Sequence, residues 1–369
     1  MNISSYMPVN VVCGNGCVKE NSALFGSVGK RCLIVTGGNS AKKSGALADV
    51  CASLEKENIA YEIFDEITEN PYTADCHRAG VKAREMNADF IVGIGGGSPL
   101  DASKAVAIYA SNPDLAPVDI YAMAHKNRPL PLVLVGTTSG TGSEVTGVSV
   151  LTNSENNMKK SISGPDCYSV ISFCDYTYTL TVPYAVTVST MLDAFAHACE
   201  GYFSSTANSL SDTYAEKAFE MLKDGFDYFM NEKSLPDEKM RETLYIASLY
   251  AGLCLNITGT CFPHTMGYLL TEDFGIAHGR ACAAFIPDFI KISDEFMHEK
   301  ASHMAEIMKT DCDTLCNVIE TLADINIRIT DEAMEKYSHR WSDPLKNFSR
   351  TPGNFTSDTA VEIIKRYNY

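Results

Sequence analysis

Short apolar runs alternate with helical patterns through the first half of the chain. The apolar runs cover residues 31–37 (RCLIVTG), 60–66 (AYEIFDE), 90–95 (FIVGIG) and 131–135 (PLVLV). Amphipathic patterns over 44–58 and 75–87 predict helices in the two intervals between the first three runs. Strands that alternate with helices indicate a parallel sheet with helical crossovers. We therefore expect an α/β domain over residues 1–181.

Helical patterns dominate the second half, where strand signals fade from about Val182. The clearest are SDTYAEKAFEMLKDGFDYFM at 211–230 and DEKMRETLYIASLYAGLCL at 237–255. A Pro/Gly/Ser-rich stretch at 342–357 precedes one last helix. We expect an all-helical C-terminal domain over 182–369, with the boundary near Thr181.

The segment after the third apolar run combines a glycine turn with the start of a helix. Gly95, Gly96 and Gly97 permit close backbone approach, Ser98 can cap the helix with Pro99 at its first position, and Asp101 follows. Unpaired N–H groups at a helix N-terminus attract an anion, so a pyrophosphate is expected over this turn. The alternative is a tight turn without a ligand, because the run is not GxGxxG.

A second glycine- and hydroxyl-rich loop, GTTSGTGSEVT at 136–146, follows the apolar run at 131–135. Ligands of open α/β sheets bind at the carboxyl ends of the strands, so Thr137, Thr138 and Ser143 are candidate contacts. A solvated loop held by its own Ser and Thr hydrogen bonds is the alternative. The two loops together favour a Rossmann-like, dinucleotide-binding first domain.

Four residues of the second half have the pattern of one divalent metal site. Asp193 and His197 stand four residues apart, on one face of a predicted helix, and His264 and His278 follow 14 residues apart. One carboxylate oxygen and three imidazole nitrogens suit iron, zinc or manganese. Each histidine alone is more often a satisfied core or surface residue, so spacing leaves both interpretations open.

Together these segments resemble the iron-containing (group III) alcohol dehydrogenases, from about Met7 to about Pro287. The segments GGGSPLDASKA, GTTSGTGSEVT, MLDAFAHACEGY and AHGRACA are similar to that family's signatures. The resemblance implies an Fe²⁺ or Zn²⁺ centre, a pyrophosphate turn and a set of nucleotide contacts. The implied metal ligands are Asp193, His197, His264 and His278, the turn is Gly95–Ser98, and the contacts are Thr137, Thr138, Ser143 and Lys160.

Tyr268 departs from the family pattern, because it stands four residues after His264 where many members carry another histidine. Its phenol either relays a proton or narrows the pocket, and packing alone is the alternative. We name Tyr268 and His278 as candidate catalytic residues. Residues from about 300 onward match no motif.

Coenzyme choice can be argued from the loop after residues 31–36. A carboxylate there would bind the ribose hydroxyls of NAD and repel an additional phosphate. Gly37, Asn39 and Ser40 provide none, but they leave room and offer amide or hydroxyl donors, which makes them candidate coenzyme contacts. Lys42 and Lys43 follow. We therefore expect NADP(H) to be favoured over NAD(H), although lysines at the start of a helix are usually only solvated.

Composition agrees with a metabolic enzyme that acts on small molecules. The 369 residues suggest two domains, and the net charge of −16 disfavours nucleic acid and anionic membranes as partners. The first residues do not form a signal peptide, and no apolar run is long enough to span a bilayer. The 13 cysteines fit reduced thiols better than disulfides. We expect a cytoplasmic enzyme, and a homodimer.

The expected function is metal-dependent hydride transfer between NAD(P)(H), NADPH favoured, and a small aldehyde or primary alcohol, in a cleft between the two domains. A lyase of the dehydroquinate synthase type and a polyol dehydrogenase of the glycerol dehydrogenase type are the enzymatic alternatives. The third alternative is a nucleotide-binding protein that has no catalytic activity.

Overall fold

The computed structural model describes residues 3–342 and 345–367. Residues 343–344, inside the Pro/Gly/Ser-rich stretch predicted over 342–357, lie outside the described residues, as do 1–2 and 368–369. The chain divides into two compact units. One consists of Tyr6–Val182 with Asp237–Tyr245, and the other mainly of Pro183–Pro236 and the chain from Ile246 onward.

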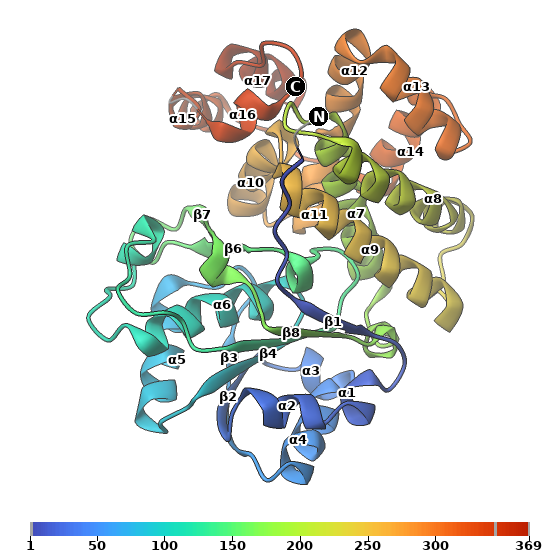
Figure 1. Ribbon diagram of the computed structural model, residues 1–369. Coiled ribbons are helices and arrows are strands. Elements are labelled where there is room, and N and C mark those ends of the chain that lie inside the picture. Colours follow the sequence, from blue (N-terminus) through green and yellow to red (C-terminus); the bar gives the residue numbers. More distant parts are fainter. Residues whose placement is uncertain (1–2, 343–344, 368–369) are drawn as a thin grey trace. The chain divides into compact units, whose positions relative to one another are not determined.

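The first unit is built on a six-stranded sheet in the order β1-β8-β5-β4-β2-β3 (Figure 1). Every neighbouring pair in this sheet runs parallel. The strands are β1 (Asn10–Cys13), β2 (Arg31–Gly37), β3 (Ala60–Ile67), β4 (Phe90–Gly95), β5 (Leu132–Gly136) and β8 (Ile171–Cys174). The predicted parallel α/β sheet is confirmed.

Helices cover both faces of this sheet, which explains why its central strands are apolar throughout. Successive side chains of a strand point to opposite faces. Cys32 and Ile34 accordingly pack in one core cluster, whereas Leu33 and Val35 pack in the other. The first cluster lies against α1 (Cys17–Glu20), α2 (Ala23–Val28) and α4 (Ala46–Lys56), and the second against α5 (Thr73–Glu85) and α6 (Gly97–Ser111).

The chain reverses its direction of travel across the sheet at β2 and β4. These strands are neighbours, but α4 follows β2 on one face and α6 follows β4 on the other. In an open α/β sheet such a switch point leaves a crevice at the carboxyl ends of the two strands. Gly37 and Gly95 are the last residues of these two strands, so the loops that follow them begin there.

A separate two-stranded antiparallel sheet was not predicted from the sequence. It joins β6 (Val148–Thr152) to β7 (Lys159–Ser163), with Val148 opposite Ser163 and Thr152 opposite Lys159. The edge strand β1 and its neighbour β8 are also absent from the prediction. They are only four residues long, which is too short for a periodic pattern to be recognised.

Within its described residues, the second unit has helices and connecting segments but no strand, which confirms the predicted fold class. Its helix α9 starts in the sheet unit. The helices are α7 (Tyr184–Phe203), α8 (Ser209–Asn231), α9 (Glu238–Thr258), α10 (Phe262–Phe274), α11 (His278–Ala283), α12 (Ile286–Phe296), α13 (His298–Ile307), α14 (Cys312–Ala323), α15 (Asp331–Arg340), α16 (Lys346–Arg350) and α17 (Ser357–Ile364).

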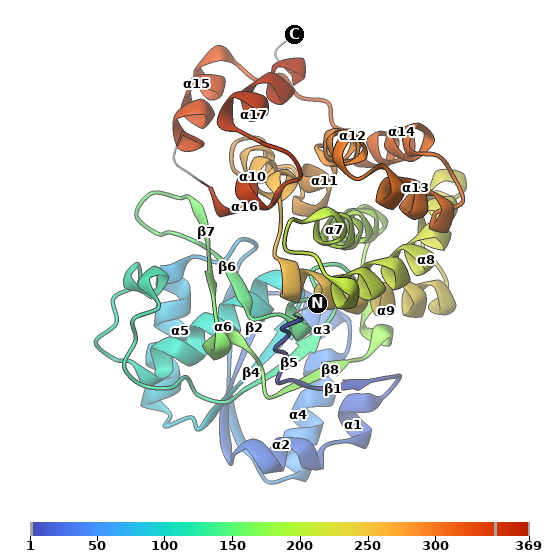
Figure 2. The ribbon, with the colours of Figure 1, turned by 45° about the horizontal axis from the view of Figure 1, so that its top comes forward.

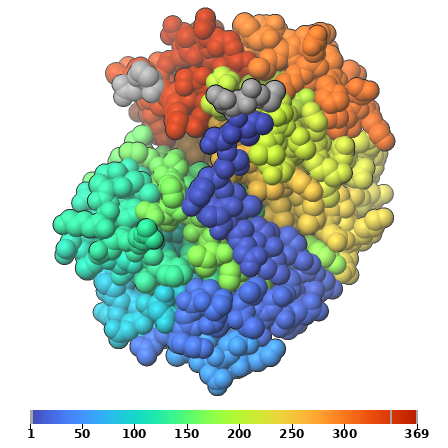
Figure 3. All heavy atoms as spheres, in the orientation of Figure 1, coloured from blue at the N-terminus to red at the C-terminus, as the bar shows by residue number. Residues whose placement is uncertain are grey.

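Helix α7 is the core helix of this unit. Helices α8, α10, α11, α12 and α14 contact it, and Figure 2 shows it among them. All residues from Met191 to Phe203 are buried, although this stretch includes an aspartate, a histidine and a glutamate. On the face drawn in Figure 3, the orange residues of α12 and α13 form part of the unit's outer surface. The polar groups of α7 therefore need partners inside the unit.

Among the described residues, no single helix is long and apolar enough to cross a membrane. Helices α9 and α10 meet the length and composition criteria only as a pair, which is bent by 112°. All 13 cysteines lie within the described ranges and are free thiols.

Candidate functional site

The structure brings the four predicted metal ligands together inside the helical unit. Asp193 and His197 come from one face of α7, His264 from the first turn of α10, and His278 from the first position of α11. The Nε2 atoms of His197, His264 and His278 lie 3.9, 3.7 and 3.9 Å from Asp193 Oδ1. Three imidazoles thus surround a single carboxylate oxygen.

Close packing of α11 on α7 carries His278 into this cluster. The residue after it is Gly279, and a Cβ there would lie 1.8 Å from Ser189 O and 2.8 Å from Asp193 Cβ. Only a residue without a side chain permits this approach. Gly279 therefore sets the distance between the third histidine and the carboxylate.

Two atoms of the cluster have no hydrogen-bond partner within the described part of the chain. They are Asp193 Oδ1 and His264 Nε2, and the two residues are only 3% and 4% exposed. Buried polar atoms without a partner are costly, so such a pair points to a group that the chain itself does not supply. A carboxylate oxygen with imidazole nitrogens suits Fe²⁺ or Zn²⁺, and the residues present fit that ion.

Glu200 is a fully buried carboxylate that the sequence did not single out. Its Oε1 lies 2.5 Å from His264 Nδ1, and its Oε2 accepts a hydrogen bond of 2.7 Å from the Cys261 backbone N–H. A carboxylate at Nδ1 places the ring proton there and leaves the lone pair on Nε2, which faces Asp193. Glu200 follows Asp193 by seven residues, a helical spacing that could have revealed it.

Cys282 is a second residue that the sequence did not single out. The potential ligand atoms of Asp193, His264, His278 and Cys282 all lie within 4.8 Å of one another. Cys282 follows His278 by four residues, the same spacing that joins Asp193 to His197. That repeated spacing was the available signal.

Electrostatics in the cluster oppose the effect of burial. Burial raises the pKa of Asp193. The neighbouring imidazoles, His197 most strongly, lower it by a larger amount, so the pKa lies below its usual range. Burial lowers the pKa of His264, but Cys282, Glu200 and Asp193 together raise it well above its usual value. The Asp193 carboxyl is therefore favoured in its charged form, which is the form that binds a metal ion.

Tyr268 lies beside the predicted ligands. Its ring stacks on that of His278, with centroids 5.8 Å apart and planes 18° apart. It stands one helical turn after His264 on α10, so the two side chains share a face of that helix. The phenol is half-buried, unlike the fully enclosed His264.

The glycine turn at the end of β4 differs in one detail from its prediction. Gly96 is the residue before α6, in extended conformation, so the helix begins at Gly97 rather than at Pro99. Ser98 is therefore not the cap, and its Oγ accepts a hydrogen bond of 3.1 Å from Asn70 N. Pro99 fits inside the first turn because its missing N–H would have no helical partner there.

The second predicted loop packs directly on this turn. The Thr137 backbone N–H donates to Gly95 O at 2.9 Å. A Cβ on Gly96 would lie 3.0 Å from Thr138 Oγ1, so this glycine permits close contact between the two loops. Gly95, Gly96, Gly97, Thr137 and Thr138 thus lie together at the carboxyl ends of β4 and β5.

Asp101 and Ser143 hold the second loop in place. Ser143 Oγ donates to Asp101 Oδ1 and accepts from Lys104 Nζ, both at 2.7 Å. Asp101 Oδ2 accepts from Val150 N at 2.8 Å. Lys104 is fully buried, and burial lowers its pKa although Asp101 opposes the shift. The hydrogen bonds of these three side chains tie α6 to the loop and to β6.

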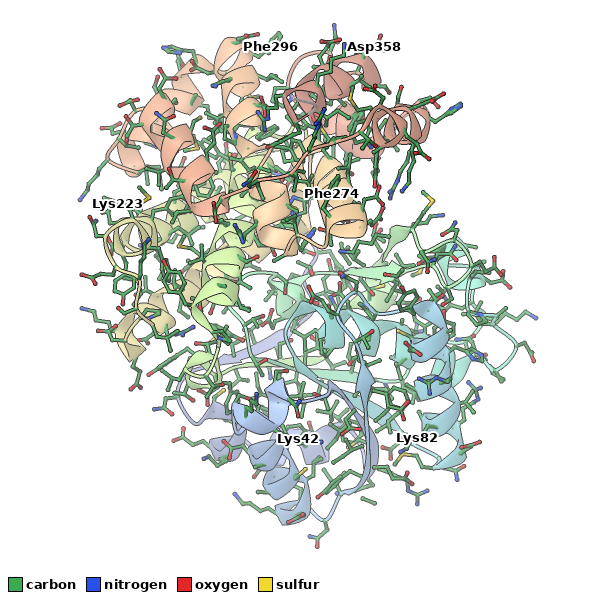
Figure 4. All side chains as sticks on the ribbon, turned by 180° about the vertical axis from the view of Figure 1, so that it is seen from behind. Lys42, Lys82, Lys223, Phe274, Phe296 and Asp358 are labelled. Atoms are coloured by element: carbon green, nitrogen blue, oxygen red, sulfur yellow. The ribbon has the colours of Figure 1, made fainter. Side chains whose placement is uncertain are left out.

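The remaining predicted coenzyme contacts lie at the start of α3 (Ser40–Lys43) and on β7. Gly37 ends β2, and Asn39 precedes the helix that begins at Ser40. Lys42, labelled in Figure 4, extends from this helix and forms an ion pair of 2.7 Å with Asp65 of β3. Lys160 lies on β7, where its Nζ is 5.1 Å from the centroid of the Tyr121 ring.

Family models match both halves of the chain. The model described as "Iron-containing alcohol dehydrogenase" matches residues 8–176, and "Fe-containing alcohol dehydrogenase family, C-terminal" matches residues 187–344. Among curated proteins, the 1,3-propanediol dehydrogenase of Klebsiella pneumoniae is 33% identical over 296 residues, which cover 79% of this chain and 74% of that protein.

Solved structures with the same fold are also similar over nearly their whole length. An iron-containing alcohol dehydrogenase of Thermotoga maritima superposes with a TM-score of 0.91, at 33% identity over 99% of each chain. A sulfoacetaldehyde reductase of Bifidobacterium kashiwanohense, solved in complex with NAD⁺, gives 0.87 at 25% identity, over 100% of this chain and 99% of that one.

Proposed function

Because the chain belongs to the iron-containing alcohol dehydrogenase family, an oxidoreductase family of alcohol dehydrogenases and aldehyde reductases, we propose that it interconverts a small aldehyde and its primary alcohol with NADP(H). The observation that carries this proposal is the buried cluster in which three imidazole Nε2 atoms lie within 3.9 Å of Asp193 Oδ1. The proposed ligands of Fe²⁺ or Zn²⁺ are Asp193, His197, His264 and His278.

The chemistry divides between bound groups and the chain's own residues. When bound, the metal supplies a Lewis acid for the carbonyl oxygen, and the nicotinamide supplies or accepts the hydride. Asp193 and the histidines hold the cation, and Glu200 keeps the Nε2 lone pair of His264 directed toward it. Tyr268, stacked on His278, is proposed to border the substrate and to hold a proton at its hydroxyl.

The coenzyme is proposed to bind at the switch point of the sheet unit. Gly95–Ser98 would receive the pyrophosphate at the start of α6, with Asp101 and Ser143 positioning the loop that contains Thr137 and Thr138. Gly37, Asn39, Ser40 and Lys160 complete the proposed contacts. We further propose that residues 1–181 form the coenzyme domain and 182–369 the metal and substrate domain of a cytoplasmic homodimer.

Reconstitution tests the metal-dependent activity. The purified chain would be stripped of metal, reloaded anaerobically with Fe²⁺ or Zn²⁺, and assayed for NADPH and NADH oxidation with short aldehydes. We expect turnover only with metal, and loss of both bound metal and turnover in Asp193→Asn. Asp227→Asn, on the exposed side of α8, is the control and should keep both. Absence of turnover with every metal would contradict the proposal.

Coenzyme preference is tested at Gly38. A Cβ there meets nothing within 4 Å, so Gly38→Asp adds a carboxylate beside the proposed ribose site without a steric clash. We expect the KM for NADPH to rise about tenfold or more, since a charge repulsion of about 1.4 kcal/mol gives a factor of ten. NADH should be affected less. Gly38→Asn matches the size without the charge and should leave the preference for NADPH unchanged.

A further inference from the structure

Cys282 completes a compact group of potential ligand atoms in the helical unit. Its sulfur lies within 4.8 Å of the ligand atoms of Asp193, His264 and His278. The side chain is fully buried, and its Sγ is 3.7 Å from both ring nitrogens of His278. Contacts of this length to both nitrogens do not amount to one directed hydrogen bond.

The backbone of two helices makes room for this sulfur. His278 and Cys282 are four residues apart on α11, so both side chains lie on the same face of the helix. On the facing helix α10, a Cβ on Gly267 would lie 3.0 Å from Cys282 Sγ and 3.0 Å from its backbone nitrogen. Helix α10 thus lacks a side chain at the point where the thiol is packed.

A second, independent observation supports a cation site at this group. Asp193 Oδ1 and His264 Nε2 belong to it, and both are buried without a hydrogen-bond partner in the described chain. These two atoms and the Cys282 sulfur lie within 4.8 Å of one another, so together they offer a metal ion oxygen, nitrogen and sulfur. Such a set suits zinc, iron or cobalt better than magnesium or manganese.

We propose that Cys282 is a thiolate ligand of the proposed metal ion, in addition to Asp193 and the histidines. The inference rests on the proposed metal centre of the preceding section. On metal binding the Cys282 S–H bond breaks, its proton passes to solvent, and the sulfur lone pair forms the bond to the metal without any change of oxidation state. Thiolate and carboxylate together then neutralise the charge of a divalent ion.

Cobalt substitution tests this directly, because a thiolate bound to Co²⁺ gives an intense charge-transfer absorption in the near ultraviolet. The full-length chain would be stripped and reloaded with one Co²⁺ per chain. We expect the band in the wild type and its loss in Cys282→Ser, measured per bound cobalt. Cys316→Ser alters another buried cysteine of the same unit, outside the ligand group, and should keep the band.

X-ray absorption of the zinc-loaded wild type makes the test independent of how any variant folds. A sulfur neighbour at about 2.3 Å supports Cys282 as a ligand, since nitrogen and oxygen ligands lie nearer, at about 2.0–2.2 Å. Stoichiometric metal with no charge-transfer band and only nitrogen and oxygen neighbours would overturn this inference while leaving the proposed function intact. Failure of the chain to take up any metal would overturn both.

Discussion

Glu200 determines which nitrogen of His264 faces the carboxylate of Asp193. Its Oε1 occupies the Nδ1 side of the ring, and its Oε2 is held by the Cys261 backbone N–H. An imidazole with its proton fixed on Nδ1 keeps Nε2 available to a metal. Glu200 is therefore a positioning residue that acts through His264.

Glu200→Gln should weaken the metal site without unfolding the chain. The amide oxygen can still accept from His264, but the amide NH₂ would oppose the Cys261 N–H, so the ring loses its fixed orientation. We expect metal affinity to fall about 10- to 100-fold, the usual cost of losing such a partner. A competition titration with a chelator measures it. Glu220→Gln, in an exposed ion pair on α8, should leave the affinity unchanged, and an unchanged value in Glu200→Gln would refute this role.

The sequence indicates some residues of the site and not others, and the reason is physical. The i, i+4 spacing of Asp193 and His197 identifies two side chains on one helix. Spacing cannot show that the second turn of α11 faces α10, which is what places Cys282 beside His264. That convergence depends on packing at Gly267 and Gly279, where a glycine is required by its neighbours and not by a turn.

The approach of α11 to α7 is the most constrained helix contact of the site. A methyl group on Gly279 would lie 1.8 Å from Ser189 O, a distance that no rotation of a side chain can relieve. The two helices would have to separate, and His278 would move with α11. The packing of α11 on α7 and the binding of metal therefore both depend on Gly279.

Gly279→Ala should consequently lower both stability and metal content. Overpacking of this kind costs about 1–3 kcal/mol, and more where backbone must move. Urea unfolding and metal analysis of the same preparation measure the two effects. Gly38→Ala is the matched control, because its Cβ meets open space, and it should change neither. If Gly279→Ala bound metal normally, the close approach would not be what positions His278.

The central strands could be predicted because burial on both faces makes them continuous apolar runs, as in PLVLV before the 136–146 loop. The start of α6 was placed two residues too late, at Pro99 instead of Gly97. The prediction favoured a serine cap, but the extended Gly96 already ends the turn and Ser98 is hydrogen-bonded to the Asn70 backbone. Tertiary contacts thus overrode the local capping signal.

A buried carboxyl links the stability of the folded chain to pH. Glu144 lies in the 136–146 loop, is 3% exposed, and accepts a hydrogen bond of 3.0 Å from Tyr245 Oη. Burial raises its pKa, although hydrogen bonds from the backbone and from Tyr245 partly offset the shift. A carboxyl with a raised pKa stabilises the folded chain in its protonated form. This stabilisation is complete below the unfolded pKa of about 4.3, and it is lost as the pH rises through the raised folded pKa.

Glu144→Gln keeps an oxygen for Tyr245 and has no proton to lose. The free energy of unfolding of the variant, relative to the wild type, should therefore rise as pH increases from about 4 to about 8. Urea unfolding across that range gives the difference curve. Glu155→Gln, at an exposed position between β6 and β7, should give a flat one. A flat curve for Glu144→Gln would show that the carboxyl ionises as readily in the folded chain as in the unfolded chain.

The four-residue spacings within α7 and α11 restrict which insertions and deletions these helices can tolerate. Each inserted or deleted residue rotates the rest of a helix by about 100°, which would carry one member of a pair away from the cluster. Substitutions can accumulate around these pairs, but changes of length cannot. Natural variants should therefore differ in length in the loop at 232–237, and never between Asp193 and Glu200 or between His278 and Cys282.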